Sequence, residues 1–67
     1  MPDNELIEKA LQGAHSADVA KLYGVLVGAI VAAQNDQNKI NVAKERFQKG
    51  LQISKLAYEV AKEAAGL

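Results

Sequence analysis

Gln34-Asn35-Asp36-Gln37-Asn38 is the stretch that decides the fold of this 67-residue chain. Short polar side chains such as those of Asn and Asp compete for backbone hydrogen bonds, so they favour caps and turns over helix interiors. Three of these five residues are Asn or Asp, and the other two are also polar. We therefore predict a turn here, with one helix before it and another after it.

The segments on either side of this turn are rich in residues that favour helices and contain no internal proline. Asp3 or Asn4 is a suitable N-cap for the first helix, and Gly66 is a suitable stop after the second. We predict helices over roughly residues 4–34 and 38–65. Together they form an all-α, antiparallel helical hairpin, a single domain over residues 1–67.

The segment Gly13-Ala14-His15-Ser16 leaves a second architecture open. Gly13 is able to end a helix, and Ser16 is able to cap a new one. At about 3.6 residues per turn, the larger apolar side chains of residues 6–11 and 19–30 fall on different sides, which favours a break. The alternative is therefore a three-helix bundle with a break near residues 13–16.

Uncharged, mostly small residues recur at every seventh position of both predicted helices, like the a and d positions of a coiled coil. In the first helix the two lines are Ala10, Ala17, Gly24 and Val31, and Leu6, Gly13, Ala20 and Val27. In the second helix they are Ala43, Gly50, Ala57 and Ala64, and Ile40, Phe47, Ser54 and Ala61. We predict that these lines form the contact between the helices, which small side chains would hold close together.

The two sets of lines also predict the register, that is, which residue of the first helix faces which residue of the second. The numbers of facing residues in an antiparallel pair add to a constant, and both Ala17 with Ala57 and Gly24 with Gly50 add to 74, which is centred on Gln37 in the predicted turn. A glycine inside a helix costs about 1 kcal/mol relative to alanine. Close helix packing at this point would account for that cost, so we predict that Gly24 faces Gly50.

Larger apolar side chains remain outside this predicted contact. They are Val19, Leu22, Tyr23, Leu26 and Ile30 in the first helix, and Leu51, Ile53, Leu56, Tyr58 and Val60 in the second. A large contiguous apolar surface marks an interaction site, and a chain of this size buries only about 60% of its unfolded surface by folding alone. We expect a homo-oligomer that uses these residues as its interaction surface, with another protein as the alternative partner.

The charges of the two halves of the sequence have opposite signs. Residues 1–36 contain five acidic and two basic residues, for a net charge of −3, and residues 37–67 contain six basic and three acidic residues, for +3. Complementary charge favours antiparallel pairing of the halves or a head-to-tail assembly of copies.

No catalytic or metal-binding pattern is visible in the sequence. The chain has no cysteine, and its one histidine, His15, is too few for a zinc site. His15, Ser16 and Asp18 lie too close in sequence to converge as a hydrolase triad. We expect no enzyme activity and no cofactor, and the even mixture of basic and acidic residues predicts no nucleic-acid binding.

The longest uncharged apolar run, residues 22–33, is shorter than the roughly 20 residues that cross a bilayer, which disfavours a membrane-spanning helix. The acidic start of the chain does not resemble a secretory signal, so we expect a cytoplasmic protein or one exported by a signal-independent route. The leading hypothesis is a small structural or interaction module that self-associates into a helical oligomer or filament. The alternatives are a membrane-associated helical protein that uses residues 19–33, and an adaptor or chaperone for another protein.

Overall fold

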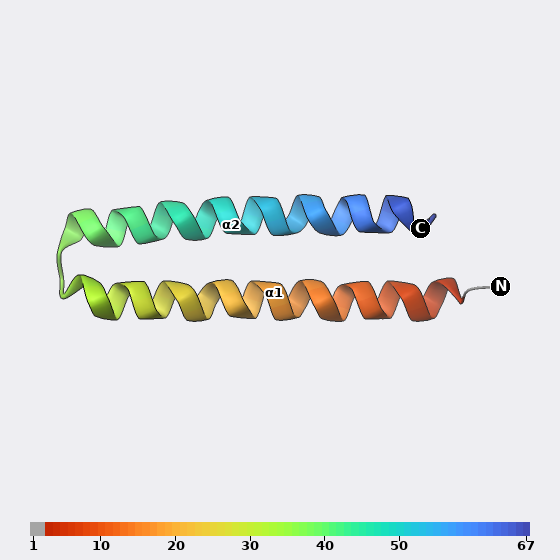
Figure 1. The fold of residues 1–67 in the computed structure, drawn as a ribbon, viewed down its shortest axis with the longest axis horizontal. Coiled ribbons are helices and arrows are strands. Elements are labelled where there is room, and N and C mark those ends of the chain that lie inside the picture. The colour runs from red at the N-terminus through yellow and green to blue at the C-terminus, as the bar shows by residue number, and fades with distance from the viewer. Residues whose placement is uncertain (1–2) are drawn as a thin grey trace.

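A computed structural model describes residues 3–67 as a hairpin of two antiparallel helices (Figure 1). Helix α1 spans Asn4–Ala33 and helix α2 spans Gln37–Ala64. The described chain is a narrow rod of 53 × 15 × 8 Å, with the start of α1 and the end of α2 at the same end of the rod. This confirms the all-α hairpin, and each predicted helix boundary lies within one residue of the observed one.

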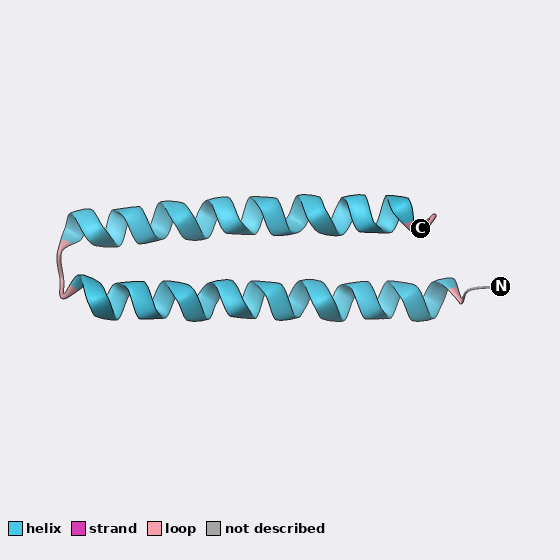
Figure 2. Cartoon of the chain, viewed as in Figure 1, coloured by secondary structure: helices cyan, strands magenta, loops and turns pink. Residues whose placement is uncertain are grey.

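The turn is a short loop between the two helices (Figure 2), and two of its residues have a left-handed backbone. Gln34 and Asn35 have φ angles of 48° and 65°, which end α1 directly after Ala33. Asp36 then returns to an extended backbone, and its carboxylate accepts hydrogen bonds from the backbone N–H groups of Asn38 at 3.0 Å and Lys39 at 3.4 Å. Asp36 is therefore the N-cap of α2, and the whole reversal is completed by three residues.

Local capping also explains where α1 begins and α2 ends, at the open end of the hairpin. The carboxylate of Asp3 accepts hydrogen bonds from the N–H groups of Glu5 at 3.0 Å and Leu6 at 3.4 Å, so Asp3, and not Asn4, caps α1. At the other terminus Gly66 adopts a φ of 77°, and the N–H of Leu67 donates to the carbonyl of Lys62 at 2.9 Å. The predicted stop at Gly66 is confirmed, since only glycine enters this region at little cost.

The three-helix alternative is wrong, because α1 runs without a break through residues 13–16. Gly13 and Ser16 are exposed, where neither disturbs the packing. The face of α1 that packs on α2 passes through this segment at His15, four residues after Leu11 and four before Val19. Residues four apart lie on the same side of a helix, so the apolar face continues across the segment and no break is needed.

Very little of the hairpin is buried. The buried residues are Ala33, Ala43 and Ser54, and no large side chain among residues 3–67 is fully enclosed. Around them lies a layer of half-buried residues, which are Ile7, Leu11, His15, Val19, Leu22, Leu26 and Ala29 of α1 and Ile40, Phe47, Gly50, Leu51, Tyr58, Ala61 and Lys62 of α2. Two helices alone therefore form a seam, but no enclosed core.

The predicted helix contact is wrong for α1. Its two predicted lines, Ala10, Ala17, Gly24 and Val31 with Leu6, Gly13, Ala20 and Val27, are all exposed. The helix instead turns its larger side chains, such as Leu11, Leu22 and Leu26, toward α2. Burying a leucine contributes about 1.5–3 kcal/mol, far more than burying an alanine or a glycine, so the bulkier of two uncharged faces is the one that packs.

The prediction for α2 is mostly correct. Ala43 and Ser54 are buried and Ile40, Phe47, Gly50 and Ala61 are half-buried, whereas Ala57 and Ala64 are exposed. The predicted pairing of Gly24 with Gly50 does not form. A Cβ atom at Gly50 would lie 2.8 Å from Cδ2 of Leu22, whereas a Cβ at Gly24 would have nothing within 4 Å. Gly50 thus makes room for a leucine of α1.

Candidate interaction surface

The ten residues predicted as an interaction surface divide into two groups. Five of them, Val19, Leu22, Leu26, Leu51 and Tyr58, are half-buried in the seam between the helices. The other five, Tyr23, Ile30, Ile53, Leu56 and Val60, are exposed. The prediction missed exposed apolar residues that it had placed in the helix contact, chiefly Leu6, Val27 and Val31, and it assigned no role to exposed Val25.

Helix α1 is apolar on all sides from Leu22 to Ala33. Val31 is 73% exposed and Tyr23 is 62% exposed, although no charge occurs between Leu22 and Ala33. Among residues 3–67, α1 is the one helix long and apolar enough to cross a membrane by length and composition, and only 6% of its most apolar 18-residue stretch is buried in the hairpin. A helix that is apolar all round is normally enclosed by other helices or by lipid.

A polar layer crosses the seam near the open end. His15 Nδ1 and Ser54 Oγ are 3.1 Å apart, and the ring of His15 stacks on that of Tyr58 with centroids 4.8 Å apart and planes 9° from parallel. Lys62 Nζ lies 4.8 Å from the centre of the same Tyr58 ring. The two contacts of His15 link one residue of α1 to Ser54 and Tyr58 of α2, so they fix the register of the two helices, and the contact of Lys62 with Tyr58 lies within α2.

Three hollows lie along one side of the hairpin. Their volumes are about 420 Å³ beside the turn, 90 Å³ farther along and 220 Å³ near the open end. They are lined by Ala14, Asp18, Val25 and Ala32 of α1 and by Lys39, Val42, Arg46 and Ala57 of α2, among others. Along each helix these residues recur near whole numbers of turns, so they share one side of the hairpin, which we call the grooved face.

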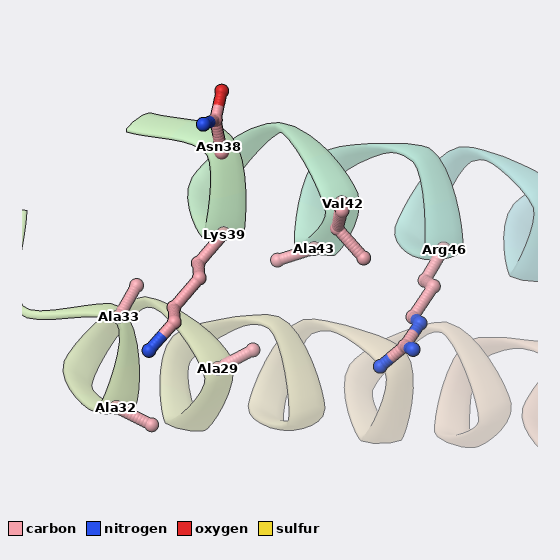
Figure 3. Close-up of a pocket in the computed structure, with 8 residues that line it drawn as sticks. All are labelled: Ala29, Ala32, Ala33, Asn38, Lys39, Val42, Ala43 and Arg46. Atoms are coloured by element: carbon pink, nitrogen blue, oxygen red, sulfur yellow. The ribbon is translucent and has the colours of Figure 1, made fainter. Parts of the chain in front are cut away.

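Two cations border the hollow beside the turn. Figure 3 shows the side chains of Lys39 and Arg46 extending from α2 toward α1, over a floor of Ala29, Ala33 and Ala43. The one ion pair within residues 3–67 lies elsewhere, between Lys9 Nζ and Glu5 Oε1 at 3.4 Å. Lys39 and Arg46 therefore have no carboxylate of their own chain within ion-pair distance.

Folding converts the charge pattern of the sequence into a pattern along the rod. The half that contains the turn, residues 19–54, has five basic and two acidic residues, for a net charge of +3. The open half, residues 1–18 with 55–67, has three basic and six acidic residues, for −3. The hairpin is thus positive at the turn and negative at the open end.

No group of three or more His, Cys, Asp or Glu side chains that could hold a metal ion occurs within residues 3–67. The main surface features of the described chain are the apolar outer side of α1, the grooved face and the opposite charges of the two ends. Comparison of the chain with known protein families, curated proteins and solved structures finds no match.

Proposed function

We propose that this protein is a structural module that self-associates through its helices into a larger helical assembly. The observation that carries the proposal is the exposure of α1, a helix with no polar side between Leu22 and Ala33 that has only one neighbouring helix to cover it. Exposed apolar area of this kind is removed from water most simply by packing against further helices.

The total surface of the hairpin supports the same proposal. The hairpin exposes 5323 Å² to solvent, whereas a compact monomer of 7.2 kDa exposes about 4,100 Å². The excess of about 1,200 Å² is larger than the roughly 800 Å² that each partner buries in a standard protein interface. A single hairpin thus carries enough surplus surface for a stable contact.

The test is the dependence of unfolding on concentration. Association stabilises the folded chain by mass action, so the thermal midpoint of the circular dichroism signal should rise steadily over a hundredfold range of protein concentration. A cooperative transition whose midpoint stays constant over that range would refute self-association.

The apolar length of α1 favours one second candidate, a membrane-associated protein that uses residues 19–33. Lys21 lies within this segment and Asp18 just before it, and α2 carries charges along its length. These charges favour a position at the bilayer surface over a full span. Flotation with liposomes separates the two candidates, because a self-associating module stays at the bottom of the gradient and a membrane-associated one rises with the lipid.

A further inference from the structure

We propose that two copies of this chain pack antiparallel through their grooved faces, related by a two-fold axis at the middle of the rod. The inference rests on the proposed self-association and specifies its partner, surface and orientation. In this arrangement the turn of each copy lies beside the open end of the other, and α1 runs antiparallel to α1 of the partner copy.

The shape of the grooved face fits a second copy. Val25 lines one of the hollows, and Ile53 follows the lining residue Arg46 by two helix turns, so both project from the grooved face. They are 65% and 59% exposed. In an antiparallel pair, Val25 is as far from the middle of the rod as Ala14, which lines the hollow near the open end. Val25 of each copy therefore meets the hollow at Ala14 of the other, a knob-into-hole contact repeated by the symmetry.

The two charges at the centre of α1 make the contact self-complementary. Asp18 lines a hollow of the grooved face, and Lys21 lies between Asp18 and Val25 on the same side of the helix. Because these residues flank the middle of the rod, the two-fold axis brings Asp18 of each copy beside Lys21 of the other. A parallel pair would instead place like charges together, which opposes association.

The ends of the rod favour the same orientation. Antiparallel copies bring each +3 half beside a −3 half, and Lys39 and Arg46, which have no acidic partner in their own chain, come to lie beside the acidic end of the second copy. Opposite charges in register steer association and select one orientation over the other.

The orientation is measurable with spin labels, because the chain has no cysteine and each single-cysteine variant carries one label. Asn38→Cys places the label at the turn and Gln52→Cys places it near the middle of α2, both on exposed positions. Asn38 is about 12 residues from the midpoint of α2, so the two-fold axis separates its labels by about 37 Å along the rod. The two Gln52 labels lie near the axis, so the distance between them should be shorter than the distance between the Asn38 labels by at least about 15 Å.

Similar distances for the two label pairs would overturn the antiparallel arrangement while leaving self-association intact. Absence of any intermolecular distance, with a monomer at every concentration, would overturn both the arrangement and the proposed function. The two failures are therefore distinguishable.

Charge reversal supplies a second test that does not depend on labels. Asp18→Lys alone and Lys21→Asp alone place like charges across the two-fold axis, and each variant should associate about tenfold more weakly than the unmodified chain. A mixture of the two variants should recover the lost affinity, because only the mixed pair has opposite charges at both contacts. If the mixture associates no better than its components, Asp18 and Lys21 do not meet across an interface and the arrangement is wrong.

Discussion

Gly24 and Gly50 lie inside helices at similar heights along the rod but in different surroundings. Gly50 is half-buried and a Cβ there would press on Cδ2 of Leu22 at 2.8 Å, whereas Gly24 faces open space. The two glycines therefore have opposite structural roles. Gly50 lets a leucine approach α2, and Gly24 only weakens the helix that contains it.

Alanine substitution should separate these roles. Gly24→Ala should stabilise the hairpin by about 1 kcal/mol through helix propensity. Gly50→Ala should lose most or all of that gain, because crowding a packed side chain costs about 1–3 kcal/mol. Urea unfolding at one fixed protein concentration measures both values, and equal stabilisation by the two substitutions would contradict the placement of Leu22 against Gly50.

The hydroxyl of Ser54 is the buried polar partner of His15. Ser54→Ala removes this hydrogen bond, and the expected cost is about 1 kcal/mol of unfolding free energy. Ser16→Ala is the matched control, because Ser16 is exposed on α1 and surface substitutions usually change stability by less than about 0.5 kcal/mol. If the control costs as much as Ser54→Ala in urea unfolding, the bond between His15 and Ser54 contributes nothing.

At the scale of the element, the turn holds Gln34 in a left-handed conformation with a φ of 48°. This region costs a residue with a side chain roughly 1–2 kcal/mol relative to the right-handed one. Glycine is free of that cost, so Gln34→Gly should raise the unfolding free energy by about 1 kcal/mol.

Gln37→Gly is the control for the turn, since Gln37 begins α2 and its side-chain amide donates to Asn41 Oδ1 at 3.0 Å. This substitution should destabilise the hairpin in the same urea titration. A stabilising Gln37→Gly, or a destabilising Gln34→Gly, would contradict the observed backbone of the turn.

The elements also show which parts of the fold follow from sequence. The helix ends were predictable because they depend on local chemistry, such as the capping carboxylate of Asp36 and the left-handed Gly66. The facing side of α2 was largely predictable because charged and polar residues such as Glu45, Lys49 and Gln52 occupy its outer side. The side of α1 that faces α2 was not predictable, because this helix has two uncharged sides and only the packing of Leu22 and Leu26 decides between them.

The exposure of the larger apolar side chains was half predictable for the same reason. Tyr23, Ile53 and Leu56 are exposed as expected, but α1 turns Leu22 and Leu26 toward α2 and leaves Val27 and Val31 exposed in their place. The grooved face could not be predicted, because the hollows depend on how the two helices come together.

At the scale of the whole molecule, the opposite charges of the two ends predict a salt dependence. Screening lengths shorten from about 10 Å at 0.1 M salt to about 3 Å at 1 M. Antiparallel association should therefore weaken by several-fold over this range in sodium chloride. A dissociation constant that stays the same or falls would show that the end charges play no part in the contact.

The central claim is that this hairpin is incomplete as a single copy, because α1 has only one neighbouring helix and the rod exposes about 1,200 Å² more than a compact chain of its size. Sedimentation equilibrium at low micromolar concentration tests this claim most directly. The account predicts a mass of at least two copies of the 7.2 kDa chain, and of two copies for the pair joined through the grooved faces. A folded, helical species with a mass of 7.2 kDa at all concentrations would contradict it.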